Sequence, residues 1–378
     1  MRFFIGGLRN VPPIFRKLPE AEWQWRPYLD GMFELHSVSV AALVAGVVAV
    51  SVTARAAESY PPLPETVTSF GAVTSEGWLY AFGGHKGTRH DYCVEMVSGS
   101  FNRLNLKDGS QWEELPSAMP GQGQPLVAWD HQIYRVGGMA ARNHAQEKQD
   151  LYSMALAERF DPAKKTWEKI APLPAPRSSH DAVVLDNKLY VAGGWNLSGG
   201  TNKPIWPANA LVLDLKRPQY GWREFPQPFQ RRALALAATG GRVYCIGGMD
   251  NDNQPTLAVD LYDTKTGKWL KGPELPTGKF KGFSCSAITQ DGRIYVAAFH
   301  GDLLRLSEDE QSWEVVGRLE HPRMAHRLVT AGKGQLIALG GEDGEEKRPD
   351  LELLKPSKEP LPPEKITAAT AQAGTAHP

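Results

Sequence analysis

A short apolar run that ends in two glycines recurs along this chain of 378 residues. In its fullest form the run reads Lys-Leu-Tyr-Val-Ala-Gly-Gly, at 188–194. An apolar and aromatic run of this kind favours a β-strand, and glycine near its end marks a bend or a close backbone approach. Counterparts lie at 79–84, 133–138 and 243–248, with degenerate copies at 294–298 and 336–341. The interval of roughly 50 residues predicts a repeat architecture.

A tryptophan is the second landmark of the repeat. It follows a polar turn, such as 161–166, and most copies are followed by a Leu-Pro or Phe-Pro pair. The tryptophans are Trp112, Trp167, Trp222, Trp269 and Trp313. Each repeat is therefore expected to form four short antiparallel strands, which in the third repeat lie at 181–185, 188–192, 211–215 and 222–225.

The double glycine, the nearby tyrosine and the tryptophan together resemble the Kelch repeat, over about residues 60–355. The resemblance implies an all-β fold, a six-bladed Kelch-type β-propeller with four-stranded antiparallel blades. The fifth repeat lacks the double glycine, and the sixth lacks both the tyrosine and the tryptophan. Because one blade buries too little surface by itself, the blades must stack face to face in a ring. The glycine pairs do not have the spacing of phosphate-binding loops.

The charge balance and the cysteine count argue against a nucleic-acid partner and against a disulfide framework. The 42 basic and 42 acidic residues cancel, whereas a nucleic-acid-binding surface needs a basic excess. No nucleic-acid partner is therefore expected. Three cysteines are too few for a disulfide framework. Cys245 and Cys285 are interpreted as small core residues of neighbouring blades, with a bond between them left open. We expect a monomer.

The N-terminal segment, residues 1–57, contains an uncharged apolar run at 38–52. This run of about fifteen residues is shorter than the roughly 20 that a membrane span usually needs. Ala54-Arg55-Ala56 then suits cleavage before Ala57, so we expect a secretory signal peptide. The alternative is a retained signal anchor, which would tether the protein to a membrane. Both interpretations place the propeller, residues 58–357, outside the cytoplasm, in a periplasmic or secreted location.

The two ends of the repeat region compete to close the ring. Residues 57–64 end in Pro-Pro-Leu-Pro, which resembles the exit of the second blade, and we favour them as the outermost strand of the last blade. The competing segment is 360–362. Residues 358–378 are rich in Pro, Ala and Thr without an apolar period, so a disordered tail is expected there.

Strand alternation places the longest loops on one face of the propeller, at 85–99, 139–153 and 195–208. The linkers between blades open on the same face and carry three pairs of basic side chains: Arg177 with His180, Arg231 with Arg232, and Arg323 with His326. Equivalent positions of a ring converge on its axis, so guanidinium groups near one channel mouth would form an anion site. The alternative interpretation is that these arginines cap blade edges and pair with loop carboxylates.

The first loop is the densest in functional side chains. It carries Arg89, a candidate ligand-binding residue, together with His90, Asp91 and Glu95. Neither a metal site nor another cofactor is expected, because the loop has no HExxH or CxxC pattern. In the third loop, Trp195 and Trp206 either stack on a sugar ring or pin their own loop.

Two functional hypotheses follow. The first is a binding propeller whose long loops and channel mouth hold a glycan, a small anionic sugar or a protein, by analogy with other proteins of the fold. The second is an enzyme similar to N-acetylneuraminate epimerase, an exported bacterial Kelch protein that interconverts the anomers of sialic acid. Such a mutarotase needs general acid and base groups, for which the candidates are Glu95, Asp91, His90 and His326.

Overall fold

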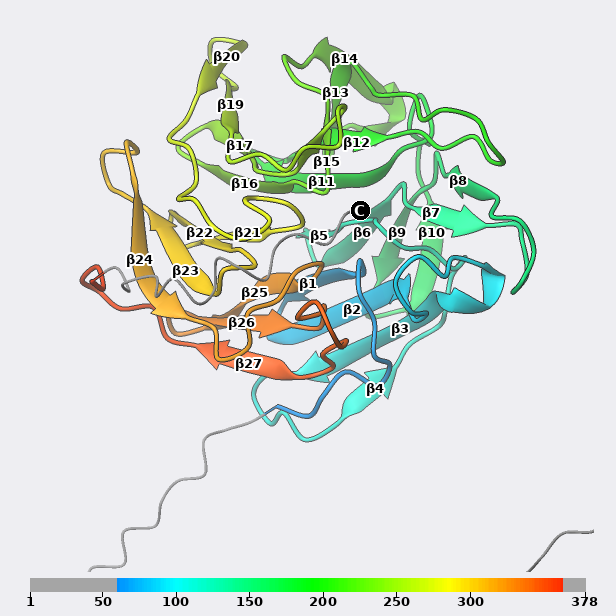
Figure 1. Cartoon of the computed structure of the whole chain (residues 1–378), viewed down its shortest axis with the longest axis horizontal. Coiled ribbons are helices and arrows are strands. Elements are labelled where there is room, and N and C mark those ends of the chain that lie inside the picture. The colour runs from blue at the N-terminus through cyan, green and yellow to red at the C-terminus, as the bar shows by residue number, and fades with distance from the viewer. Residues whose placement is uncertain (1–59, 363–378) are drawn as a thin grey trace, which may run out of the picture. The chain divides into compact units, whose positions relative to one another are not determined.

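The computed structural model describes residues 60–362, which form a β-propeller of six sheets (Figure 1). Within this range the only helices are two 3-10 turns, η1 (Val94–Met96) and η2 (Pro218–Tyr220). No helix among these residues is long and apolar enough to cross a membrane. The apolar run at 38–52 and the expected cleavage site lie outside the described residues.

Five blades each have four antiparallel strands, and in every blade the first strand is the one nearest the axis. Blade one comprises β1 (Gly71–Ser75), β2 (Trp78–His85), β3 (Val97–Asn105) and β4 (Trp112–Glu114). Blade two comprises β5 (Leu126–Trp129), β6 (Gln132–Val136), β9 (Ala157–Asp161) and β10 (Thr166–Lys169). Blade three comprises β11 (Ser178–Leu185), β12 (Lys188–Trp195), β13 (Asn209–Asp214) and β14 (Trp222–Pro226).

Blade four comprises β16 (Ala235–Thr239), β17 (Arg242–Ile246), β19 (Val259–Asp263) and β20 (Lys268–Lys271). Blade five comprises β21 (Ser286–Gln290), β22 (Arg293–Ala297), β23 (Asp302–Leu306) and β24 (Trp313–Arg318). Blade six has three strands among the described residues: β25 (Arg327–Gly332), β26 (Gln335–Leu339) and β27 (Leu351–Leu354). Two short ribbons on the loop face pair β7 (Met139–Ala141) with β8 (Leu151–Ser153), and β15 (Arg231–Arg232) with β18 (Met249–Asp250).

The innermost strands close into a ring. Each of β1, β5, β11, β16, β21 and β25 contacts the next, and β25 contacts β1 (Figure 1). Apolar side chains fill the spaces between neighbouring sheets, so the core is divided into clusters that each join two blades. The fold predicted from the repeats is confirmed. Cys245 and Cys285 are buried free thiols, as expected of core residues.

The repeated tryptophans join each blade to the one before it. Trp167 in blade two donates its indole N–H to the carbonyl of Pro116, at the exit of blade one, over 2.9 Å. The indoles of Trp222, Trp269 and Trp313 donate in the same way to Ala171, Pro226 and Pro273. This recurring bond explains why the tryptophan and the proline-rich exit occur together in the sequence.

The same bond shows which chain end adjoins blade six. Trp112 in blade one donates to the carbonyl of Pro61 over 3.2 Å, and Leu63 donates its backbone N–H to Pro349, just before β27. The N-terminal segment thus takes the position that a blade exit takes elsewhere, although residues 57–59 of the expected strand are not described. The competing segment lies on blade five instead, where Leu361 donates to Val315 of β24.

The first residues of the expected disordered tail pack against blade five. The expected tail begins at 358, but residues 357–362 lie along the outer strand of blade five. Arg305 donates to the carbonyls of Ser357 and Lys358, and Arg318 donates to that of Pro362. Residues 363–378 lie outside the described part of the chain.

The first glycine of each pair is required by a close approach between blades. Gly193 has φ of 71°, and a Cβ atom there would lie 2.2 Å from the side chain of Leu234 in blade four. In blade two, Gly137 has φ of 62° and faces His180 of blade three. A side chain at either position would combine left-handed backbone strain with overlap, which explains the repeated glycine.

Candidate functional site at the loop face

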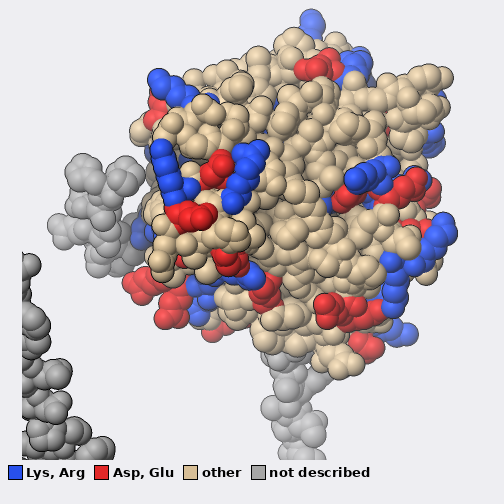
Figure 2. Space-filling view, turned by 90° about the vertical axis from the view of Figure 1, so that its right-hand side faces the viewer, with Lys and Arg blue, Asp and Glu red and all other residues tan. Residues whose placement is uncertain are grey.

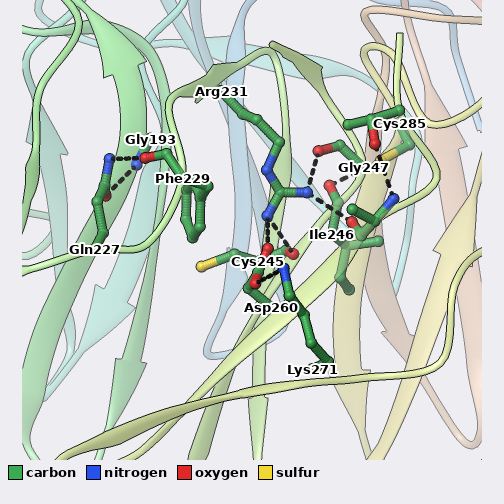
Figure 3. Close-up of polar contacts among 12 residues, drawn as sticks. Gly193, Gln227, Phe229, Arg231, Cys245, Ile246, Gly247, Asp260, Lys271 and Cys285 are labelled. Atoms are coloured by element: carbon green, nitrogen blue, oxygen red, sulfur yellow. Dashed lines mark hydrogen bonds and ion pairs between the residues drawn. The ribbon is translucent and has the colours of Figure 1, made fainter.

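The linker arginines are buried inside their own blades. Arg231 is 3% exposed, and its guanidinium lies between the second and third strands of blade four (Figure 3). It donates to the carbonyls of Gly247 and Ala258 over 2.9 and 2.6 Å. It also forms an ion pair of 2.6 Å with Asp260, whose second oxygen binds Lys271. All of these partners are structural, so Arg231 caps the end of a blade.

Arg177 and Arg323 repeat this arrangement. Arg177 donates to the carbonyls of Gly193 and Asn209, and burial lowers its pKa to about 10. Arg323 donates to the carbonyl of Gly340 and forms an ion pair of 2.6 Å with Asp350. The three guanidinium groups thus belong to blades three, four and six, and they do not meet in one anion site. The observed arrangement is the alternative one, in which the arginines cap blade edges.

The two linker histidines are also enclosed. His180 and His326 are each 3% exposed. Burial, with a smaller contribution from Arg177, lowers the pKa of His180 to about 3. Burial and the charge of Arg323 lower the pKa of His326 to about 3. Both rings are therefore neutral at physiological pH and are packed between blades, where they do not reach the channel mouth.

A ring of six backbone hydrogen bonds encircles the axis at this face. Each blade contributes one residue at or near the start of its innermost strand, with φ between 51° and 64°. Its N–H donates to the carbonyl of the equivalent residue in the preceding blade over 2.7 to 3.1 Å. The residues are Ser69, Gly123, Ser179, Ala233, Ser284 and Ala325. We call this set the axial ring. Because the Ser69 N–H binds Ala325, the axial ring has no break.

An ion pair joins blades six and three two residues further along the innermost strands from the axial ring. Arg327, on β25, extends across to Asp181 on β11 and forms an ion pair of 3.1 Å. It also donates to the carbonyls of Phe70 and Gln124 in blades one and two. The other Asp181 oxygen accepts the N–H of Leu236 in blade four. The axial ring and this ion pair give the channel mouth a floor, so a ligand would bind above them.

Arg232 is the linker arginine that faces the mouth. Its guanidinium lies 4.2 Å from the ring centroid of Trp195 and 5.8 Å from that of Phe283. One terminal nitrogen lies 3.0 Å from the sulfur of Met249, and Nε is buried without a partner. Burial lowers the pKa of Arg232. No carboxylate within residues 60–362 forms an ion pair with it, which leaves a fixed cation available to an anion.

Of the two loop tryptophans, Trp195 contacts the Arg232 guanidinium and Trp206 packs beside Trp195. Trp195 and Trp206 have ring centroids 5.8 Å apart, and Trp195 also carries Arg232 on its face. Ile205, beside them, is 59% exposed. Trp195 therefore fixes a functional group as well as its loop, and the pair forms an aromatic wall on one side of the mouth.

The first loop places its candidate residues at the rim. Arg89 forms an ion pair of 2.8 Å with Glu342 of blade six. His90 and Asp91 are exposed, and the carbonyl of Asp91 binds His85. Glu95 is exposed and binds His144 of blade two over 2.7 Å, a hydrogen bond that lowers the pKa of Glu95 to about 2. These four candidates surround the mouth without forming one cluster.

Loops of blades one to three are joined into a continuous wall. Asn143 accepts the N–H of Val94 and donates its amide to the carbonyl of Tyr92. Asp150 accepts the N–H of Gly200 in the third loop. Since each loop binds the next, the wall presents a pre-organised edge to a ligand.

Sequence reasoning missed several residues of the mouth. Glu342 directly follows the glycine pair of the sixth repeat. Lys347 donates to the carbonyl of His85 in blade one over 2.5 Å. Burial lowers the pKa of Lys347 to about 8. Tyr92 lies within electrostatic reach of Glu342 and Arg232. The position of Glu342 after a double glycine is the one signal in the sequence that points to it. No group of three His, Cys, Asp or Glu side chains in the described range is placed to hold a metal ion.

Comparison with known proteins agrees with this architecture. Residues 69–301 match the KLHDC2/KLHL20/DRC7 Kelch-repeats domain. The match covers more than half of the chain, which therefore belongs to this Kelch-repeat family. Domains of this kind are typically protein-binding modules.

Individual relatives are distant. Kelch-like protein 35 of Mus musculus is 26% identical over 63% of this chain and 36% of its own length. Kelch-like protein 40 of Xenopus laevis is 28% identical over 66% of this chain and 37% of its own length. The chain thus spans little more than a third of these curated relatives. The solved structure of YjhT aligns with a TM-score of 0.64 at 16% identity, over 80% of this chain and 98% of that one. That likeness concerns the fold.

Proposed function

We propose that this protein is a binding propeller whose loop face holds a ligand with a carboxylate group, presented by a protein or a glycan. The observation that carries the proposal is Arg232, a guanidinium fixed on Trp195 and without a carboxylate partner in the described range. A charge-assisted hydrogen bond to a carboxylate would satisfy it. The loop wall and the floor of the mouth supply a rigid frame.

The proposal is tested by calorimetric titration of the full chain with a hexaglutamate peptide and with N-acetylneuraminic acid. Arg232→Ala should weaken binding by about 1.5–3 kcal/mol, the value of a charge-assisted hydrogen bond. Arg232→Lys should retain part of the affinity, because the charge remains. Arg217→Ala, on the opposite face, is the matched control. Unchanged affinity in Arg232→Ala, or no binding of either probe, would refute the site.

The alternative is a sialic acid mutarotase that uses the same mouth. Its support is Tyr92, which lies within electrostatic reach of both Arg232 and the Glu342 carboxylate and thus offers an acid or base group beside the proposed anion site. NMR of anomer exchange in N-acetylneuraminic acid decides the question. A rate no higher than the spontaneous one would remove the enzyme.

We further propose that the protein acts outside the cytoplasm. The support is the apolar run at 38–52 followed by Ala54-Arg55-Ala56. N-terminal sequencing of the protein from its native cells should begin at Ala57 if a signal peptide is removed. An intact N-terminus in the membrane fraction would indicate an anchor, and an intact N-terminus in the cytosol would contradict export.

A further inference from the structure

A groove lies on the face opposite the loops, between blades two and three. Two adjoining cavities of about 240 and 610 Å³ make it up. They share Trp129, Asp130 and Arg159. The larger cavity continues along Asn187, Leu215 and Pro218 of blade three. Its volume is within the range of small-molecule sites. Its lining residues lie at and beside the hairpins of blades two and three on the face opposite the long loops, so this groove is separate from the loop-face mouth.

Trp129 is the central feature of this groove. It ends the innermost strand of blade two, where blades one, four and five end theirs with Ser75, Thr239 and Gln290. Its indole N–H donates to the side chain of Asn187 over 3.1 Å. Packing against the apolar core beneath it holds the ring further, and the residue is only partly buried. The sequence thus places a large, immobilised aromatic ring at an open cavity, at a strand end where three other blades have small or polar residues.

The groove is balanced in charge, and four of its six charged side chains form ion pairs. Arg159 binds Glu168 over 2.7 Å, and Lys164 binds Asp161 over 3.1 Å. With Asp130 and Lys216, the lining has three acidic and three basic residues. Figure 2 shows the same interspersion of charges on the side of the propeller that faces the viewer. A phosphate or an acidic peptide would meet no surplus positive charge here.

This combination indicates a neutral ligand rich in hydroxyl groups. A fixed aromatic ring accepts the apolar face of a pyranose, since its geometry and area suit a flat, partly apolar partner. Ion-paired carboxylate and guanidinium groups still offer acceptors and donors to hydroxyls, and their pairing holds them in place. We propose that the groove between blades two and three is a second binding site, for a neutral oligosaccharide, in which a sugar ring stacks on Trp129 and bonds Asp130 and Arg159.

The test is a titration of the full chain with four neutral probes: cellotetraose, maltotetraose, chitotriose and mannotriose. Saturation-transfer NMR and calorimetry, up to about 10 mM, would detect affinities at the weak end of the usual range. We expect at least one probe to bind, Trp129→Ala to weaken it by more than about tenfold, and Trp129→Phe to retain most of the affinity. Thermal unfolding of both variants establishes that they are folded.

Two controls separate this site from the loop face. Tyr220→Ala removes a neighbouring aromatic that is 77% exposed and lines neither cavity, and Arg232→Ala removes the proposed anion site. Both should leave the binding of the neutral probe unchanged. Binding that survives Trp129→Ala in the folded variant, binding lost in Arg232→Ala, or no binding of any of the four probes would overturn the proposal. None of these results depends on whether the loop face binds an acidic ligand.

Discussion

Arg327 and Asp181 are 146 residues apart in the chain, yet the guanidinium of the first and a carboxylate oxygen of the second lie 3.1 Å apart. They come from the innermost strands of blades six and three. Through its other bonds, this pair also engages backbone groups of blades one, two and four. One ion pair therefore links five of the six blades at the axis.

Removing Arg327 should destabilise the protein. Arg327→Met leaves Asp181 as an uncompensated, buried charge, and we expect it to lower the free energy of unfolding by about 3–5 kcal/mol. Asp181→Asn keeps an acceptor for Leu236 and should cost less. In urea unfolding, the double variant should be more stable than the sum of the single losses predicts. Strictly additive losses would show that the two residues do not act as a pair.

The buried arginine of blade four should be structural. Arg231→Met removes the buried partner of Asp260 and several carbonyl bonds, and leaves Asp260 with Lys271 alone, so a loss of about 3–5 kcal/mol is expected in urea unfolding. Arg217→Met, an exposed arginine paired with Asp214, should change stability by less than about 1 kcal/mol. If Arg231→Met instead left stability intact and abolished ligand binding, the capping role would be wrong.

Acidification should destabilise the propeller through its buried histidines. The pKa of His180 and that of His326 are about 3 in the folded protein, against about 6.5 when unfolded. Between these values the unfolded state binds more protons, so stability falls as the pH falls, by up to about 1.4 kcal/mol per pH unit for each ring. Leu234 occupies the equivalent position in blade four. The double variant His180→Leu/His326→Leu should therefore fold, and its free energy of unfolding should depend less on pH.

The comparison is made by urea unfolding at several pH values between 6.5 and 3.5. His131→Leu serves as the control, because that ring is exposed at a hairpin. A slope that is the same in the double variant and in the control would contradict the assignment to the buried pair.

The junction between the last and first blades should resemble the others in strength. Trp112→Phe deletes the indole bond to Pro61, and Trp167→Phe deletes the equivalent bond to Pro116. Each should reduce the free energy of unfolding by about 1 kcal/mol, the net value of one hydrogen bond. If Trp167→Phe lowers the free energy of unfolding and Trp112→Phe leaves it unchanged, the N-terminal segment does not contribute to closure of the ring.

The sequence is sufficient to predict the architecture because the repeat encodes it locally. The double glycine indicates a close approach between blades, as at Gly193, and each tryptophan indicates a hydrogen bond to the preceding blade. The spacing of these residues therefore predicts the number of blades and the order of their strands. In the third blade the predicted strands are all present, but β11 starts at Ser178 and β12 continues to Trp195, because pairing between these two residues extends the sheet beyond the glycines. The bounds of β13 and β14 differ from the predicted ones by one or two residues.

The site is harder to predict, because equivalent positions do not imply equivalent directions. Arg231 and Arg232 are neighbours in the chain, yet the first enters its blade and the second faces the mouth, since successive residues of an extended segment point to opposite sides. Spacing alone suggests that Arg177, Arg231 and Arg323 converge. Their burial depends on carbonyl groups at the ends of strands, and no sequence pattern reports which carbonyls lack a partner.

The axial ring has a consequence for how the two faces of the molecule can operate. Its six amide donors are all occupied by neighbouring carbonyls, and the side chain of Arg327 reaches from blade six to Asp181 of blade three. The groups around the axis therefore already have partners within the protein, so binding groups on either face must come from the loops and hairpins of that face. Each face can therefore have its own ligand specificity, independent of the other face.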